Sequence, residues 1–93
     1  MVTDHFVLFY NTADDYLEKR QAYRSEHLGM IYEEMDAGRL LQGGAFDGAP
    51  NQAMLIFTSQ EAAEAFAQKD PYVLNGVVVD WHVRVWKTVD PKA

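Results

Sequence analysis

Arg24 and His27 are the residues of this sequence whose types and spacing best fit chemistry. At about 100° per residue, a helix through them presents an apolar stripe formed by Leu17, Leu28, Ile31 and Met35. Arg24 falls within this stripe, and Arg20 and His27 lie on its flank, whereas a helix that only packs would be apolar there. An imidazole exchanges protons near neutral pH, and a guanidinium binds a carboxylate or phenolate through paired hydrogen bonds. The pattern therefore predicts a proton-transfer group beside an anion anchor.

The elements that would position these residues begin with strands and one long helix. Strands are predicted where apolar runs are bounded by turn formers, at His5–Tyr10, Leu40–Phe46, Ala53–Phe57 and Val77–Val89. The first helix is predicted at Tyr16–Met35, and a break near Arg20–Gln21 is left open. Gly38 would end this helix in the left-handed conformation that other residues avoid.

A second helix is predicted after Thr58, which forms a capping box with Glu61. Its apolar positions are Ala62, Ala63, Phe66 and Ala67. Asp70-Pro71 ends it, because the residue before a proline is pushed out of the α region. Asp70 would then cap one further turn, Pro71–Asn75. The remaining segments are a turn and a frayed tail, at Asp47–Asn51 and Asp90–Ala93.

The element order β-α-β-β-α-β is that of a ferredoxin-like α+β fold with one four-stranded antiparallel sheet. Both helices would cover the same face of the sheet. The strands nevertheless carry apolar residues on both faces, with Phe6 and Leu8 alternating with Val7 and Phe9. Because a bare apolar sheet is unfavourable in a soluble monomer, we predict a homodimer in which two sheets stack face to face.

The composition excludes several classes of site and partner. The 93 residues predict a single domain, 1–93. The absence of cysteine excludes disulfides and thiolate metal sites, and no His or Glu spacing matches a metal motif, so we predict no metal and no cofactor. The net charge of −6 predicts no nucleic-acid partner. No apolar run suits a membrane span or a signal peptide, so we predict no membrane association and a cytoplasmic location.

Four segments together resemble the YCII-related (YciI-like) domain family. They are Arg20, Arg24-x-x-His27-Leu28, Gly38-Arg39-Leu40-Leu41 and Asp70-Pro71-Tyr72…Gly76-Val77. The resemblance runs from about Phe6 to Val89 and implies a ferredoxin-like fold assembled as a dimeric α/β barrel. It also implies an active site built from His27 and Asp70. The family is similar in architecture to muconolactone isomerases, and one member is a dehydrochlorinase of a chlorinated hydroxyquinol.

Two features depart from the family pattern. Many relatives carry a longer insert where this chain has only the turn Asp47–Asn51. The last strand holds Asp80, Trp81 and His82, which match no family motif. The substrate of a relative is therefore not carried over to this chain.

Each predicted site residue has a structural alternative. His27 is either a general acid/base or a core histidine bonded to a backbone carbonyl, and Asp70 is either its orienting partner or only a helix cap. Arg24 either binds substrate or forms an internal ion pair, for example with Asp70 or Glu34. Tyr72 either offers its phenol to substrate or simply packs. Gly43, with Gly44, either allows a ligand to approach or marks a bulge.

The leading prediction is a small cofactor-independent lyase or isomerase that works by proton transfer. Its substrate would be small and anionic or aromatic, and would bind in a cavity between the two sheets of a dimer. The alternative is a non-catalytic module that binds a small ligand in the same cavity.

Overall fold

The computed structural model describes residues 1–92 of the chain. Its strands are β1 (Val2–Thr12), β2 (Leu40–Ala45), β3 (Gln52–Phe57) and β4 (Val78–Val89). Its helices are α1 (Tyr16–Lys19), α2 (Arg24–Asp36), α3 (Gln60–Lys69) and α4 (Pro71–Leu74), with a 3₁₀ turn, η1 (Arg20–Ala22), between α1 and α2. No helix within the described range has the length and apolar character needed to span a bilayer.

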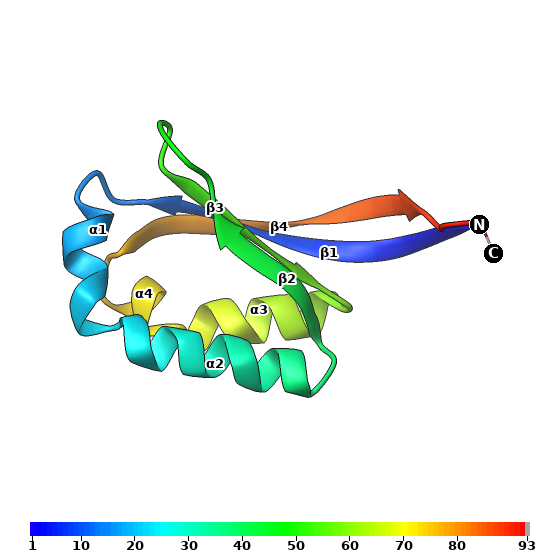
Figure 1. The fold of residues 1–93 in the computed structure, drawn as a ribbon, viewed down its shortest axis with the longest axis horizontal. Coiled ribbons are helices and arrows are strands. Elements are labelled where there is room, and N and C mark those ends of the chain that lie inside the picture. Colours follow the sequence, from blue (N-terminus) through cyan, green and yellow to red (C-terminus); the bar gives the residue numbers. More distant parts are fainter. Residues whose placement is uncertain (93) are drawn as a thin grey trace.

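The four strands form one antiparallel sheet in the order β2-β3-β1-β4. Leu8 at the centre of β1 lies opposite Leu55 on β3 and Val83 on β4. Helices α2, α3 and α4 all lie on one face of this sheet (Figure 1). The predicted ferredoxin-like α+β fold is therefore confirmed.

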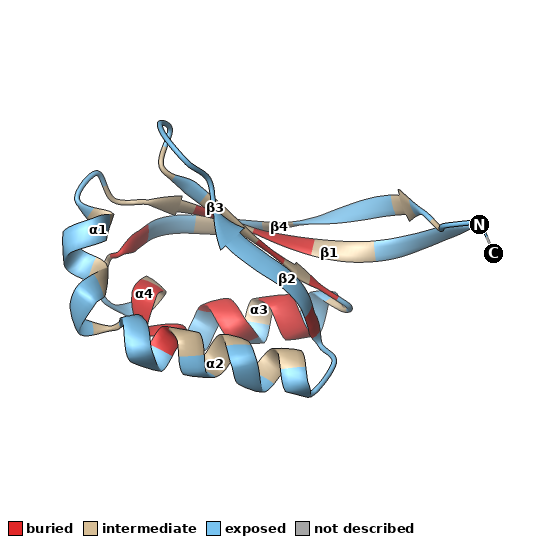
Figure 2. Cartoon of the chain, in the orientation of Figure 1, coloured by how far each residue is buried: buried red, intermediate tan, exposed pale blue. Residues whose placement is uncertain are grey.

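The core lies between the sheet and α3. Alternate residues of the central strands point to the helices, because side chains alternate between the faces of a strand, and the buried ones are Leu8, Tyr10, Leu55 and Phe57. Helix α3 buries its four predicted apolar positions against them, and the rings of Phe57 and Phe66 lie 5.5 Å apart. Figure 2 shows this buried band running along α3 and the middle of β1.

The first helical region is broken rather than continuous. Tyr23, at the junction of η1 and α2, has φ −118° and ψ −3°, and its N–H donates to the carbonyl of Arg20 at 2.9 Å. No proline or glycine causes the break, but the Tyr23 side chain packs against the core. Tertiary packing therefore overrides the uniform helical propensity of this segment. The only residue that α2 buries is His27.

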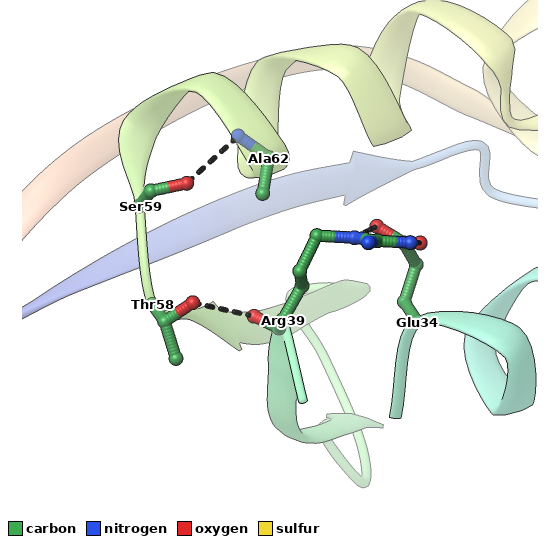
Figure 3. Close-up of polar contacts among 5 residues, drawn as sticks. All are labelled: Glu34, Arg39, Thr58, Ser59 and Ala62. Carbon is green, nitrogen blue, oxygen red and sulfur yellow. Dashed lines mark hydrogen bonds and ion pairs between the residues drawn. The ribbon is translucent and has the colours of Figure 1, made fainter. Parts of the chain in front are cut away.

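The end of α2 follows the prediction, but the start of α3 does not. Gly38 has φ 78°, and its N–H donates to Met35 O at 3.0 Å, as in a glycine-terminated helix. The predicted Thr58–Glu61 capping box is wrong. Ser59 caps α3 by accepting from Ala62 N at 3.1 Å, whereas Thr58 Oγ1 donates to the carbonyl of Arg39 (Figure 3).

Strand β4 does not alternate regularly at its start. Val77 and Val78 are both buried, although neighbours in a strand point to opposite faces, and Val79 is exposed. The register between β1 and β4 shifts at Asn11 and Thr12, and this irregularity breaks the two-residue alternation. Trp81 and Val83 then pack against the core.

One face of the sheet has no helix over it. We call this the uncovered face; it carries Val7, Phe9, Met54, Ile56, His82, Arg84 and Trp86. Strands β1 and β4 also extend beyond β2 and β3, where Val2–His5 pairs only with Trp86–Val89 (Figure 1). The backbone N–H of Asp90 still donates to Met1 O at 3.0 Å. Asp90 is the first residue of the predicted frayed tail, so the tail is still hydrogen-bonded at its start. Its last residue, Ala93, lies outside the described residues.

Candidate active site

The position of Asp70 follows from the proline after it. Asp70 leaves the helical region, with φ −64° and ψ 121°, and ends α3. Its side chain then accepts from the N–H of Tyr72 at 3.0 Å and caps α4, with Pro71 at the first helical position. The predicted cap is confirmed. Because α4 folds back onto the core, Asp70 is fully buried, with 0% of its surface exposed.

Three donors converge on the two oxygens of Asp70. Oδ1 lies 2.8 Å from Nδ1 of His27 and also accepts from Tyr72 N, while Oδ2 accepts from the hydroxyl of Tyr10 at 2.7 Å. Because a carboxylate oxygen can only accept hydrogen bonds, the His27 ring must carry its proton on Nδ1 to bond to Asp70. Among residues 1–92, no protein group bonds to Nε2 of His27, which is therefore the nitrogen left to exchange a proton.

Aromatic rings fix the orientation of His27. The ring of Tyr72 stacks on the imidazole with a centroid distance of 3.7 Å and an interplanar angle of 6°. Phe66 meets the imidazole nearly edge-on, at 6.2 Å and 72°. His27 is 8% exposed. The structure therefore excludes a backbone carbonyl as the partner of Nδ1 and brings His27 and Asp70 together.

The two tyrosines beside this pair are held as phenols. Burial, followed by the charge of Asp70 and the hydrogen bond to it, raises the pKa of Tyr10 far above its ordinary value. Burial also raises the pKa of Tyr72, against the opposing effects of Arg20 and Arg24. Tyr10 is thus a permanent donor to Asp70 at neutral pH.

His27 lies on the wall of a cavity of about 270 Å³. The wall is shared by the first helical region and the facing side of the sheet: Tyr10, Thr12, Tyr16, Arg20, Arg24, His27, Leu28, Ile31, Tyr32, Met35, Gly43, Gly44, Ala45, Ala53, Leu55 and Tyr72. Within one copy, this cavity lies between α2 and the sheet, whose facing residues on β2 and β3 include glycines and alanines. The cavity expected between the sheets of two copies stays a prediction.

Arg24, Tyr72 and Gly43 all line this cavity, as a binding role requires. The ion pairs expected as alternatives for Arg24 do not form, because Asp70 is taken by His27 and Glu34 pairs with Arg39. Figure 3 shows the planar contact between Arg39 and Glu34.

The glycines of β2 do not form the bulge expected of them. The register shift falls between Leu40 and Gln42, one step before the glycines. A side chain at Gly43 would place its Cβ 3.2 Å from Cγ of Leu55, so the glycine allows the strands to pack while leaving the cavity open.

Tyr10, Thr12 and Arg20 are cavity residues that the sequence did not single out as site residues. In the sequence, Tyr10 is one more apolar position of a predicted strand. Only the packing of β1 against α4 brings its hydroxyl to Asp70. Arg20 lies on the flank of the same predicted stripe as Arg24, and that position was the available signal. Nothing in the sequence marks Thr12.

The side chains without a predicted role lie away from the cavity. Asp80 accepts from Asn11 Nδ2 at 2.5 Å, and the ring of His82 stacks on Phe9 at 5.1 Å on the uncovered face. Trp81 packs against the core. In the described part of the chain, no three His, Asp or Glu side chains are grouped as metal ligands would be.

Residues 5–87 match the YCII-related domain family, which is most of the chain. The chain belongs to the YCII-related domain family. This YCII-related chain is 33% identical over 95 residues to the protein YciI of Escherichia coli O6:H1, covering 90% of this chain and 97% of YciI. It is 32% identical over 96 residues to an uncharacterised protein of Haemophilus influenzae, covering 91% of this chain and 98% of that protein.

Two solved structures share the fold of this YCII-related domain. One is 5-chloro-2-hydroxyhydroquinone dehydrochlorinase (TftG) from Burkholderia phenoliruptrix AC1100 in complex with 2,5-dihydroxybenzoquinone, with a TM-score of 0.72 and 20% identity over 88% of this chain and 92% of that one. The other is a dimeric ferredoxin-like protein from an uncultured marine organism, with a TM-score of 0.55 and 13% identity over 100% and 93% of the two chains. At these identities the likeness establishes the fold.

Proposed function

We propose that this chain is a cofactor-independent enzyme of the lyase or isomerase type that acts on a small molecule by proton transfer. One observation carries the proposal: His27, on the wall of the cavity, has its Nδ1 held 2.8 Å from the buried carboxylate of Asp70. The likeness to a dehydrochlorinase supports it, because loss of HCl begins with removal of a proton.

In this mechanism Nε2 of neutral His27 takes a proton from a carbon or hydroxyl of the substrate. The imidazolium that forms keeps its Nδ1–H on Asp70, whose charge stabilises it. Tyr10 donates to the other oxygen of Asp70 and prevents the carboxylate from turning. The proton then returns to another atom of the substrate in an isomerase, or leaves to solvent as a leaving group departs in a lyase.

Arg24, Tyr72 and Gly43 are proposed to hold the substrate. The guanidinium of Arg24 would stabilise the negative charge that develops when a proton is removed. The phenol of Tyr72 is a neutral donor at the same wall, and its raised pKa extends this state to more alkaline pH. Gly43 leaves room for a flat substrate against β2.

The test is the rate of the His27→Ala variant on a substrate found by screening enolic and aromatic acids, including hydroxylated quinones. A positioned general base contributes about 10²–10⁴-fold, so the variant should lose that much of kcat while circular dichroism stays native. His5→Ala is the matched control, because its ring contacts Thr88 and does not line the cavity. An unchanged kcat in His27→Ala would remove His27 from the mechanism. Ligand binding with no turnover by the wild type would favour the non-catalytic module.

We further propose a homodimer through the uncovered face. Its apolar side chains are covered by no helix of residues 1–92, and Trp86 is 49% exposed. Trp86→Asp should give monomers in sedimentation velocity, because a charge would be buried between the sheets. Leu17→Asp, at a similarly exposed position on α1, should not. A monomeric wild type at micromolar concentration would refute the dimer.

A further inference from the structure

The cavity wall formed by the first helical region changes character along its length. Its early part is aromatic and cationic, formed by Tyr16, Arg20 and Arg24. Its late part is mostly apolar, formed by Leu28, Ile31 and Met35 together with the ring of Tyr32. His27 lies between these parts in the sequence, so a ligand that spans both ends would pass the imidazole.

The cationic end holds two guanidinium groups without carboxylate partners. Neither Arg20 nor Arg24 forms an ion pair with any residue from 1 to 92. Among the described residues, no Asp or Glu lines the cavity, although the chain has 14 acidic residues against 8 basic ones. Two like charges on the wall of one cavity repel each other, and a bound anion would reduce this repulsion.

Other groups at this end are also arranged for an anion. The guanidinium of Arg20 lies 5.5 Å from the ring centroid of Tyr16, which keeps it beside the cavity. Thr12 lines the end of β1 that leads to α1, and within the described range its buried Oγ1 has no hydrogen-bond partner. A buried hydroxyl without a partner is unfavourable, and rotation of the Thr12 side chain toward the cavity would let it donate to a bound acceptor.

The wall of the cavity formed by the sheet has very small residues. Gly43, Gly44, Ala45 and Ala53 line it from β2 and β3. With one carbon or none in each side chain, they leave a slot between the sheet and the first helical region. The cavity volume of about 270 Å³ equals that of roughly nine water molecules, at about 30 Å³ each. This volume fits a single substituted ring.

On the basis of the proposed function of this cavity, we propose that its substrate is a small aromatic monocarboxylate bound in one orientation. The carboxylate lies between Arg20 and Arg24, and the ring lies in the slot over Gly43 and Ala45. The atom that loses or gains the proton is then presented to Nε2 of His27. Arg20 becomes a second substrate-binding residue beside Arg24.

The first test compares four ligands with the wild-type chain by isothermal titration calorimetry. Benzoate should bind at least about tenfold more tightly than benzamide, its neutral isostere, because charged hydrogen bonds are lost. 4-Methylbenzoate should bind at least about tenfold more tightly than terephthalate, whose second carboxylate would enter the apolar slot. Equal binding within either pair, or no benzoate binding up to about 10 mM, would overturn the proposal.

The second test removes the charges one at a time. Arg20→Gln and Arg24→Gln should each weaken benzoate binding about tenfold or more and leave benzamide unchanged. Arg39→Gln is the control, because Arg39 pairs with Glu34 and does not line this cavity. An unchanged preference for benzoate in either cavity variant would overturn the two-arginine site.

Binding is measured on His27→Ala as well, which separates this inference from the proposed enzyme. If the His27→Ala variant binds benzoate normally and the wild type turns over none of the screened aromatic and enolic acids, the anion site stands and the catalytic proposal fails. If the wild type turns over a neutral substrate and ignores benzoate, the anion site fails and the enzyme stands.

Discussion

Replacement of Tyr10 by phenylalanine tests how far the candidate site depends on a residue outside its predicted pair. Tyr10 is 2% exposed, and its hydroxyl donates to Oδ2 of Asp70 at 2.7 Å. Tyr10→Phe removes only that donor and leaves the buried ring in place. Asp70 keeps Tyr72 N and His27, but both act on Oδ1, so Oδ2 is left without its protein donor.

The expected cost follows from the charge of the acceptor. A hydrogen bond to a charged group contributes about 1.5–3 kcal/mol. For a domain of this size each kcal/mol shifts the melting temperature by about 4–8 °C, so Tm should fall by roughly 6–24 °C. If Tyr10 also holds Asp70 in place for His27, kcat on an identified substrate should fall while KM changes little.

The same variant has a signature at alkaline pH. The pKa of Tyr10 is raised in the fold and stays near its ordinary value of about 10 in the unfolded chain. The contribution of Tyr10 to stability is therefore complete below pH 10 and falls above it by about 1.4 kcal/mol per pH unit, because only the unfolded state releases the proton. Phenylalanine lacks this loss, so the deficit of the variant should disappear about one to two units above pH 10.

Urea unfolding of both proteins at several pH values from neutral to alkaline measures these effects. Tyr23→Phe is the control, because no hydrogen bond to its hydroxyl is present among residues 1–92 and it does not line the cavity. A variant as stable as the wild type at pH 7, or a deficit that is constant through the alkaline range, would refute the role assigned to the Tyr10–Asp70 contact.

Three further substitutions test separate features. Thr12→Val should raise the free energy of unfolding by about 1 kcal/mol in urea titrations, because it removes a buried hydroxyl without a partner, and a decrease would contradict this. Ser59→Ala should lower Tm through a loss of about 1 kcal/mol, and Thr58→Ala should cost less than about half of that; equal losses would argue against Ser59 as the cap. Asp70→Asn keeps an oxygen to cap α4 but loses the charge beside His27, so kcat should fall by about 10²-fold or more while the fold persists in circular dichroism, and an unchanged kcat would exclude Asp70 from the mechanism.

The pairing of His27 with a residue far along the chain shows what the sequence could predict. Asp70-Pro71 specifies a helix stop and a cap from local chemistry alone, and both are present. That His27 would be the partner of this carboxylate came from the family resemblance, because local rules do not say which helix packs beside the cap. The position of Arg24 within an apolar stripe correctly indicated an unusual helix face, since most of that stripe lines a cavity instead of a solid core.

Other features depend on packing that local patterns do not encode. The break at Tyr23 has no proline or glycine, and it arises because the ring packs inward. Thr58 and Ser59 are both good caps, and the strand geometry that directs Thr58 to Arg39 decides between them. The cavity under α2 was not predicted, because its size depends on Gly43 and Ala45 facing the helix, which follows from strand register.

Because β1 and β4 extend past the rest of the sheet, one part of β1 has a neighbouring strand on both sides and the other part has a neighbour on one side. In β1, Phe6–Asn11 has a neighbouring strand on both sides, whereas Val2–His5 has β4 alone. A two-stranded ribbon is marginal in water, so its amide hydrogens should exchange with deuterium much sooner than those a few residues further on. Contact with another molecule along the ribbon would slow that exchange and leave the interior rates unchanged. Association of the ribbon with another molecule can therefore be measured in the unlabelled protein, by comparing the amide exchange rates of Val2–His5 with those of Phe6–Asn11 in the same strand.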